Sequence, residues 1–579
     1  MKILVSTLKY FINEIVIIFC LIFLINNYIG KADKLIRADE VGYYEYLPSI
    51  FIHHDFVRKN DSIHQNPNLY HRINSINGVY VDYKNFKVNK YSGGTALLQL
   101  PFFAYSCLTS NLDGSFNDGY QSPFQKSFYY IAIFYLFLSI FFLKKLLVLY
   151  DIKKHIIFFS QLILVLATSV TNYVNYDAGF SHLYSLFAIT TFLYFIKSFI
   201  KFQKMTHFVW ASVFLGLIFL LRQPNILIVL FIPFLAGSVK NLKISFTTLF
   251  KNTQGLLLSI LLFFGIISVQ FVFWYLQIGD FFVYSYQGES FNFLDPHFFS
   301  ILFSYKKGLF VYTPILFIAT LSLIWFAYKK QFYLFFTWIG FFILLTYFLS
   351  SWWSWFYGCS YGLRAYIDFY AIFLIPFALM LDKLGKVPRL LIMGLSLFTI
   401  PINIIQTYQY KEYILHWIDM DKEKYWKVFL KTDNQYKGLL WKNNFDKNQY
   451  YTLKEITIGD IPCPENSITQ ALKIRNTDIP DFDKASIIQV FIDHEYQETN
   501  QTKVILSINK LNENHNYYWH ERYLIHFYQT ELNKWQTGSF NFEFEPITDH
   551  QEIEISLDVI TANQKEHLKN VRLKILSKK

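Results

Sequence analysis

The sequence predicts an α-helical polytopic membrane protein with about 11 transmembrane helices and a C-terminal all-β extracytoplasmic domain of sandwich or jelly-roll type. Of the 579 residues, 53% are hydrophobic and only 16% are charged, well below the roughly 25% usual in soluble domains. Apolar runs long enough to cross a ~30 Å hydrocarbon core recur through residues 1–410. Residues 411–579 carry short alternating segments instead.

Eleven apolar windows are candidate spans. They cover residues 10–29, 127–149, 156–175, 180–199, 206–222, 225–239, 255–278, 309–328, 331–350, 366–382 and 390–409. The window 225–239 is short and also fits a re-entrant segment, which leaves the count open by one or two. The first window has no small-residue cleavage site after it, so we expect a retained anchor rather than a signal peptide.

The placement of lysine and arginine predicts the orientation. With the N-terminus in the cytoplasm, 17 Lys and Arg residues fall near cytoplasmic span ends and four fall in short outer loops. The C-terminal domain is then extracytoplasmic, and the protein lies in the cell (inner) membrane. Residues 1–410 carry 31 Lys and Arg against 17 Asp and Glu, a basicity typical of cytoplasmic loops, so nucleic acid is not an expected partner.

Two outer regions are large. The loop 30–126 contains a polar stretch from Asp55 to Lys90 between two amphipathic segments, Tyr43–Phe56 and Thr95–Leu108, which we expect to be helices in the membrane interface. The region 411–579 predicts about eight strands. Its alternating runs are Ala485–His494, Lys503–Asn509, Tyr517–Tyr528, Ser539–Glu545, Glu552–Val559 and Val571–Leu576.

Acidic residues in the outer loops are the first candidates for chemistry. Asp39 and Glu40 follow the first span and precede an aromatic stretch that contains Tyr43. Asp39 is the catalytic candidate, and Glu40 and Tyr43 are candidates for substrate binding. An acid at this place can meet a lipid head group and a water-soluble partner, although an aspartate before a helix is also a common N-cap. Asp177 is the acid of the turn between the third and fourth spans, where turn chemistry is the alternative.

Cations on the outer side are the second set of candidates. Arg222 ends a span, where it either snorkels to the interface or contacts a phosphate. Lys306, Lys307 and Arg364 lie outside against the positive-inside bias, which suggests an anion there. For Arg364 the functional interpretation is favoured, because a guanidinium suits phosphate recognition. His182 begins a span, where a structural role competes with phosphate or metal binding.

Other motifs are weak or absent. The sequence has no P-loop, no nucleotide-binding glycine fingerprint, no GxSxG and no HExxH. Its four cysteines are scattered and predict neither a disulfide framework nor a zinc site. The run His53-His54-Asp55 has metal-ligand residue types, but adjacent histidines on a helix diverge, so a shared metal is disfavoured.

The order of these features resembles the GT-C superfamily of polytopic glycosyltransferases, especially protein O-mannosyltransferases and lipid A aminoarabinose transferases. The matching segments cover about 400 residues. They are Asp39-Glu40, Lys90-Tyr91-Ser92-Gly93-Gly94, Ser181-His182, Leu221-Arg222-Gln223-Pro224, Gly308-Leu309-Phe310-Val311-Tyr312-Thr313-Pro314 and Gly358 to Arg364.

The resemblance implies a polyprenyl-phosphate-linked sugar as donor and an inverting displacement onto an acceptor hydroxyl outside the cytoplasm. It implies Asp39 as general base on the acceptor and Asp177 as a second acid for sugar or acceptor. Arg364, Arg222 and Lys306 or Lys307 would neutralise the departing lipid phosphate. The need for a divalent metal ion stays open.

The chain departs from this family pattern by ending in an outer β-domain, which holds the acceptor, binds glycan or braces the membrane part. The acceptor is therefore a glycolipid, a glycan or a protein. A transporter or flippase of lipid-linked glycans is the alternative from another class, and an oligosaccharide polymerase or ligase is a neighbouring one. The candidate spans hold few ionisable residues, which favours surface chemistry over transport.

Overall fold

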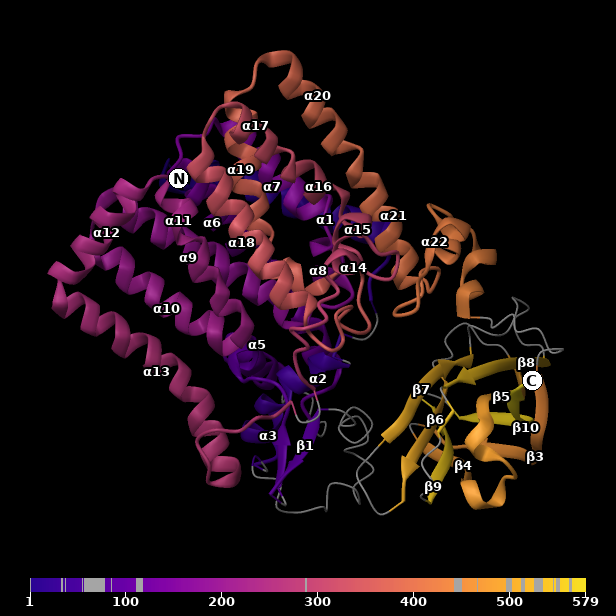
Figure 1. Cartoon of the computed structure of the whole chain (residues 1–579). Helices are drawn as coiled ribbons and strands as arrows, with labels where there is room; N and C mark the ends of the chain where they lie inside the picture. The colour runs from indigo at the N-terminus through magenta and orange to yellow at the C-terminus, as the bar shows by residue number, and fades with distance from the viewer. Residues whose placement is uncertain are drawn as a thin grey trace. The chain divides into compact units, whose positions relative to one another are not determined.

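The chain forms two compact units in a computed structural model (Figure 1). One unit comprises residues 1–411 and 417–430, and the other comprises residues 412–416 and 431–579. The structure describes residues 2–579 except 33, 34, 37, 55, 57–78, 85, 111–117, 287, 288, 442–449, 466, 496–501, 512–515, 525–534, 545, 548–551 and 562–564.

The first unit is a helical polytopic membrane part. Within the described residues, seven helices are long and apolar enough to span a bilayer. They are α1 (Lys2–Leu24) with η1 (Ile25–Ile29), α6 (Ser122–Val148), α9 (Ser181–Phe202), α13 (Thr253–Ile278), α18 (Phe332–Ser350), η6 (Arg364–Phe369) with α19 (Tyr370–Lys383), and α20 (Lys386–Leu397) with α21 (Thr399–Lys411).

Shorter helices connect and surround these spans. They are α2 (Asp39–Tyr44), α3 (Tyr46–Phe51), α5 (Gly94–Ser110), α7 (Lys154–Leu166), α8 (Val170–Asn175), α10 (Met205–Leu221), η5 (Gln223–Phe231), α11 (Ile232–Ala236), α12 (Val239–Lys251), α14 (Phe298–Phe303), α15 (Leu309–Tyr312), α16 (Pro314–Thr320), α17 (Ser322–Tyr328) and α22 (Lys422–Val428).

The span count is lower than the eleven apolar windows predicted. Three windows form apolar helices that are too short, among them α7, whose 13 residues rise only roughly 20 Å. The window 225–239 forms η5 and α11, and the chain then bends by 120° into α12, so this pair adds at most one span. Gly237 sits at the bend with φ +72°, a backbone conformation that glycine adopts without strain. The described residues thus contain seven helices, or eight with the bent pair, that are long and apolar enough to span a bilayer.

Two spans form the centre of the helical unit. In the most apolar part of α9, 83% of the residues are buried, and for η6 with α19 the figure is 94%. By contrast, only 17% of the corresponding part of α13 is buried, as expected of a peripheral helix that faces lipid. The N-terminal ends of the two central spans carry the polar residues of the site described below.

The loop 30–126 folds onto these ends. Its first amphipathic segment forms α2 and α3, and its second forms α5. Much of the polar stretch from Asp55 to Lys90 lies outside the described residues, and its described end is an antiparallel hairpin of β1 (Tyr80–Tyr83) and β2 (Phe86–Asn89). Gly42 in α2 lies against Tyr91, where an added Cβ would come within 2.1 Å of the ring, so α2 requires glycine for this approach.

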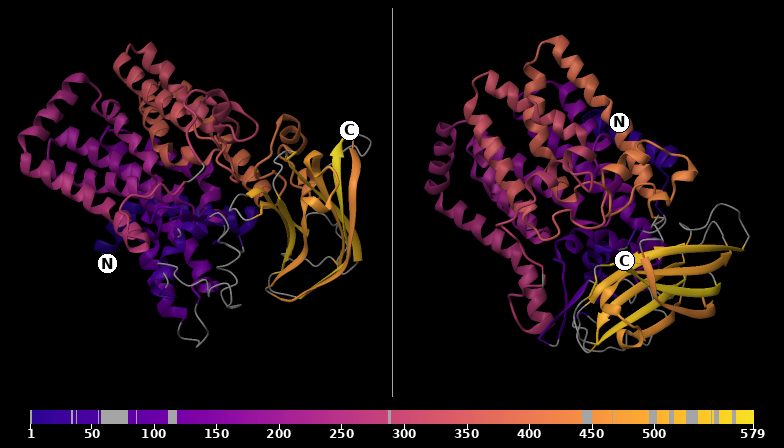
Figure 2. Two further views of the ribbon diagram at one scale, coloured as in Figure 1. Left: turned by 60° about the horizontal axis from the view of Figure 1, so that its bottom comes forward. Right: turned by 45° about the vertical axis from the view of Figure 1, so that its right-hand side comes forward.

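The second unit is a β-sandwich, which confirms the predicted all-β domain. Two four-stranded antiparallel sheets have the strand orders β3-β10-β5-β8 and β4-β9-β6-β7. They form two layers (Figure 2). The strands are β3 (Tyr450–Cys463), β4 (Ile468–Arg475), β5 (Ala485–Glu495), β6 (Lys503–Lys510), β7 (Asn516–Tyr523), β8 (Trp535–Glu543), β9 (Ile553–Ile560) and β10 (Glu566–Lys578).

Alternating apolar side chains build the core of the sandwich. Val490, Leu506, Leu557 and Leu573 come from four different strands, and each is at most 1% exposed. In each strand, residues two apart point to the same face of the sheet, so alternation buries one face and exposes the other. The six predicted runs all contain strands, whereas β3 and β4 had not been predicted.

Candidate functional site

Three segments far apart in the sequence meet in a group that we call the polar cluster. They are the first turn of α2, the N-terminal end of α9 and the N-terminal end of η6, joined by the loop after β2 and the end of α10. The polar cluster consists of Asp39, Tyr43, Tyr91, Ser181, His182, Arg222, Arg364 and Asp368.

The carboxylate of Asp39 faces a guanidinium. Helix α2 begins at Asp39, its N-cap is Ala38, and that cap makes no side-chain hydrogen bond. The predicted alternative, an Asp39 N-cap, therefore does not describe this helix. Instead Arg364 Nη1 donates to Asp39 Oδ2 at 2.7 Å, and the side chains are 15% and 27% exposed.

The charge state of Asp39 follows from its neighbours. Burial raises the pKa of Asp39, but the Arg364 charge, the hydrogen bond with Tyr91 and the charge of Lys90 outweigh it. The pKa of Asp39 therefore lies below the usual range of an aspartate, and the group is ionised at neutral pH. Burial raises the pKa of Tyr43, so its hydroxyl stays neutral.

Some donors of the Arg364 guanidinium are hydrogen-bonded and one is not. Its guanidinium lies 5.0 Å from the ring centroid of Phe180, a cation–π contact. Its Nε is buried and has no hydrogen-bond partner among the described residues. Gly358, with φ +66°, lies close to the same guanidinium, since an added Cβ would come within 3.8 Å of Nη2. One edge of Arg364 thus holds Asp39 while another donor remains for a ligand.

Arg222 connects the cluster to α9. It follows the last residue of α10 in an extended conformation, and η5 begins at the next residue with Pro224 in its first turn. Arg222 Nη1 donates to Ser181 Oγ at 3.3 Å, and Ser181 in turn donates to the Tyr43 hydroxyl at 3.1 Å. The side chain is only 19% exposed, so Arg222 is directed into the protein.

Asp368 holds the other side of Arg222. Its Oδ2 lies 3.4 Å from Arg222 Nε and accepts a hydrogen bond from Asn225 at 2.7 Å, while Oδ1 lies 2.8 Å from His182 Nδ1. Asp368 and His182 are fully buried. The remaining ring nitrogen of His182, Nε2, has no partner within the described part of the chain.

Sequence reasoning did not select Asp368, Tyr91, Ser181 or Asn225 as site residues. One signal was available, because Asp368 is an acid four residues after Arg364 in an otherwise apolar segment. A buried acid in such a segment points to a partner of opposite charge. That partner is Arg222, 146 residues away, and no local pattern identifies it.

The other predicted residues interact with backbone groups or with side chains close to them in the sequence or in space. Glu40 is fully buried and accepts from Gly179 N at 2.9 Å, and Asp177 accepts from Asn172 Nδ2 at 2.6 Å. Lys307 is buried and donates to two backbone carbonyls, those of Ser360 and Trp417. Lys306 lies 4.0 Å from the ring centroid of Phe356.

The predicted site residues therefore separate into two groups. Asp39, Tyr43, His182, Arg222 and Arg364 come together in the polar cluster. The second group makes contacts outside the polar cluster, with backbone groups, an amide and an aromatic ring. It consists of Glu40, Asp177, Lys306 and Lys307. Among the described residues, no group of three His, Cys, Asp or Glu side chains has the arrangement of a metal site.

Comparison with known proteins gives distant structural likenesses. No protein-family model and no curated protein matches the chain. The chain is similar to the oligosaccharyltransferase of Archaeoglobus fulgidus in the apo form, with 13% identity and a TM-score of 0.41 over 73% of this chain and 60% of that one. For the same enzyme in complex with Zn and sulfate the identity is 13% and the TM-score 0.37, over 69% and 52%.

A third likeness is to the arabinosyltransferase EmbB from Mycobacterium smegmatis, with 9% identity and a TM-score of 0.27 over 77% of this chain and 57% of that one. The chain thus spans little more than half the length of the structures it matches. These likenesses assign no role to any residue of this chain, so we argue its function from its own side chains.

Proposed function

We propose that this protein is a membrane glycosyltransferase. It moves a sugar from a polyprenyl-phosphate donor to a hydroxyl of a glycolipid, glycan or protein acceptor, with inversion at the anomeric carbon. The observation that carries the proposal is the Asp39–Arg364 pair, an ionised carboxylate held 2.7 Å from a guanidinium that keeps a buried, unused donor.

The two arginines suit a phosphate. Guanidinium groups recognise phosphate oxygens through paired N–H donors. The buried Nε of Arg364 has no hydrogen-bond partner in the described structure, and the Nε of Arg222 lies 3.4 Å from Asp368 Oδ2 without a hydrogen bond. Donors that are fixed before the ligand arrives stabilise negative charge as it develops on a leaving group. The two arginines would therefore bind the lipid phosphate and neutralise it as it departs.

Asp39 would take the proton of the acceptor hydroxyl. In the proposed step the acceptor oxygen forms a bond to the anomeric carbon, and the bond from that carbon to the phosphate oxygen breaks. The phosphate leaves with the bonding electron pair, and the acceptor proton moves to Asp39. Because the low pKa of Asp39 makes it a weak base, proton transfer follows cleavage of the sugar–phosphate bond rather than preceding it.

The location suits a lipid donor. The cluster lies where two central spans begin, at Ser181 and at Arg364. A polyprenyl chain in the bilayer around the helical unit would carry its phosphate to the level of the two arginines, which makes a membrane-embedded donor the natural substrate. The lysine distribution predicts that this side, and the β-sandwich, are extracytoplasmic. Alkaline phosphatase fused after residue 579 is expected to be active, and an inactive fusion would reverse the orientation.

Turnover of defined donors tests the proposal. The detergent-purified protein is incubated with radiolabelled polyprenyl-phosphate mannose, glucose and arabinose, and sugar transfer or slow donor hydrolysis is measured. Wild type is compared with Asp39→Asn and with Asp151→Asn. Asp151 lies outside the polar cluster, and its side chain is 86% exposed.

We expect turnover of one donor by wild type and by Asp151→Asn. Asp39→Asn should lose about 10²–10⁴-fold in rate at unchanged thermal stability, the usual contribution of a positioned base. Donor binding without turnover in wild type would favour a carrier of lipid-linked glycans instead. Equal turnover in Asp39→Asn and wild type would remove Asp39 from the mechanism.

A further inference from the structure

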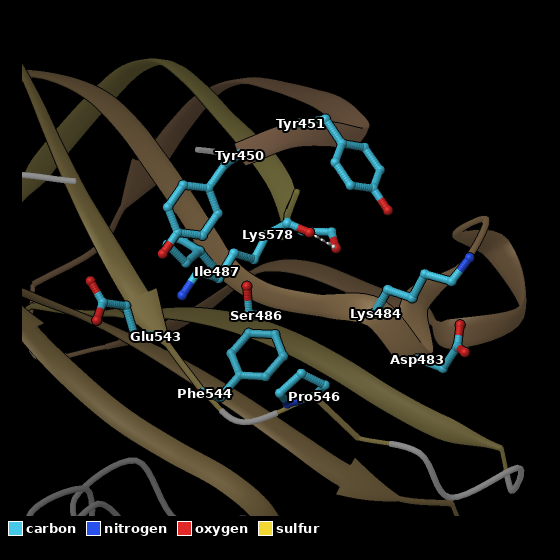
Figure 3. Close-up of a pocket in the computed structure, with 11 residues that line it drawn as sticks. Tyr450, Tyr451, Asp483, Lys484, Ser486, Ile487, Glu543, Phe544, Pro546 and Lys578 are labelled. Carbon is cyan, nitrogen blue, oxygen red and sulfur yellow. Dashed lines mark hydrogen bonds between the residues drawn. The ribbon is translucent and has the colours of Figure 1, made fainter. Parts of the chain in front are cut away.

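The β-sandwich contains a pocket that is separate from the polar cluster. Its volume is about 870 Å³, within the range of roughly 300–1,000 Å³ typical of small-molecule sites. It lies at the end of one sheet where β3 and β5 begin and β8 and β10 end, strands that are neighbours in the order β3-β10-β5-β8. Figure 3 shows the side chains that line it.

The lining combines aromatic faces with polar edges. Tyr450 and Tyr451 at the start of β3 and Phe544 after β8 supply three rings. Tyr451 is 40% exposed, so a ligand can reach its ring. In Figure 3 the hydroxyl of Ser486 lies between the rings of Tyr450 and Phe544, with the carboxylate of Glu543 to one side.

Ser486 supplies an independent sign of a ligand. Its Oγ is buried, and no hydrogen-bond partner for it exists among the described residues. Buried hydroxyls in folded proteins almost always have a partner. The backbone carbonyl of the same residue already accepts a hydrogen bond from Phe544 N at 3.0 Å. A hydroxyl of a bound molecule would complete the missing bond of the side chain.

We propose that this pocket binds a carbohydrate, as a glycan site distinct from the proposed transfer centre. Sugar rings present apolar C–H faces that stack on aromatic rings, and hydroxyl edges that bond to carboxylate, ammonium and hydroxyl groups. The pocket offers both kinds of partner. Asp483 and Glu543 balance Lys484 and Lys578, so the lining lacks the positive excess that a polyphosphate or nucleic acid requires.

A peptide fits less well. Peptides commonly bind β-domains by adding a strand along a free sheet edge. This pocket crosses the ends of four neighbouring strands and does not run along the edge strands β3 or β8. A glycan needs no free edge, because its contacts are to side chains.

Oligosaccharide titration of the full chain in lipid nanodiscs tests the proposal. The probes are maltohexaose, cellohexaose, mannohexaose, arabinohexaose and chitohexaose, with binding followed by saturation-transfer NMR and calorimetry. The pocket variants are Tyr451→Ala and Ser486→Ala. The matched control is Trp519→Ala on the other sheet, whose ring is also 40% exposed. Asp39→Asn removes the proposed transfer centre without touching the pocket.

We expect at least one probe to bind wild type, Asp39→Asn and Trp519→Ala alike. Tyr451→Ala and Ser486→Ala should each weaken that binding tenfold or more. Ser486→Ala removes one oxygen that has no partner, so it keeps the test decisive if Tyr451→Ala unfolds the domain. Binding of none of the probes, or equal binding by the pocket variants and the control, would overturn the proposal.

Binding that Asp39→Asn abolishes and the pocket variants retain would also overturn it, because the sugar would then occupy the polar cluster. The titration measures binding and requires no turnover. Its result for the pocket is therefore valid whether or not the chain transfers sugar from lipid donors.

Discussion

Two groups of charges are buried in the helical unit, and they differ in how completely they are satisfied. Glu14 in α1 accepts from Lys144 Nζ at 2.8 Å and from Gln161 Nε2 at 2.5 Å, so both its oxygens are used. Lys144 also donates to the carbonyl of Tyr10 at 2.8 Å. In the polar cluster, by contrast, the Nε of Arg364 has no hydrogen-bond partner in the described structure, and the Nε of Arg222 meets Asp368 only as an ion pair at 3.4 Å.

The difference separates a structural ion pair from a candidate site. A buried pair with every charge satisfied joins helices and has nothing left for a ligand. A buried donor without a partner carries a desolvation cost that a bound anion would remove. Both groups would look alike in a count of buried charges, and only the hydrogen-bond partners distinguish them.

Removing one partner of the structural pair should have the largest effect. Lys144→Ala leaves the Glu14 charge buried and unpaired, which should cost about 3–5 kcal/mol of stability. Thermal unfolding of the purified protein measures this loss, while the turnover of the protein that remains folded should not change. The double variant Glu14→Leu with Lys144→Met removes both charges and should recover much of the stability. A double variant as unstable as the single one would contradict the assignment.

Removing Arg364 should mainly affect turnover. Arg364→Ala takes away the proposed phosphate contact and should lower the rate of sugar transfer by about 10²–10³-fold, as loss of a preorganised donor does elsewhere. Arg364→Lys keeps the charge but loses the paired donors, so its rate should lie in between. Lys201→Ala, which removes a partly exposed cation bound to Asp151, is the matched control. Equal rates in Arg364→Ala and Lys201→Ala would exclude the phosphate role.

Asp368 should act as a positioning residue, with a smaller effect. Asp368→Asn keeps the shape but loses the charge that orients Arg222 and His182, so the KM for lipid donor should rise roughly tenfold, about 1.4 kcal/mol. The kcat at saturating donor should change less. A fall in kcat and stability together, at unchanged KM, would mean that Asp368 serves only the fold.

The pH dependence should show the smallest change. Because the pKa of Asp39 is lowered, its ion pair with Arg364 stabilises the fold above the unfolded-state value and is lost as the pH falls through the native value. The transfer rate should therefore be level from pH 7 down to about pH 4. In Arg364→Ala the acid limb should move to higher pH, and in Arg364→Lys it should move less. Coincident acid limbs in all three proteins would show that Asp39 does not titrate in the profile.

Local patterns predicted most elements of the fold. Apolar windows fixed the places of the seven long helices, and alternation fixed the strands from β5 to β10. Two of the eight expected strands, β3 and β4, were not located from the sequence because neither has a face that is entirely apolar. In β4, for example, exposed and half-buried residues alternate and no residue is fully buried. Alternation identifies a strand only where one face is fully apolar.

For the candidate site, the sequence pointed to Asp39 and Arg364 by unusual placement, an acid after the first span and a cation against the topological bias. It could not indicate that they touch, since 325 residues separate them. Sequence reasoning assigned Asp39 a catalytic role and Glu40 a role in substrate binding, without a partner for either. In the structure Glu40 is turned toward Gly179 and Asp39 toward Arg364, because neighbouring helix positions point about 100° apart.

The division of the chain into a helical part and a β part follows from the sequence, since composition and hydrophobic period are local properties that each segment carries alone. The tertiary structure alone decided which charges are paired. Pairing depends on distances of a few ångström between segments hundreds of residues apart, and burial makes those distances matter, because a charge without a partner is costly only where water is excluded. The pairing of Asp368 with Arg222 and the unpartnered Nε of Arg364 are therefore properties of the fold.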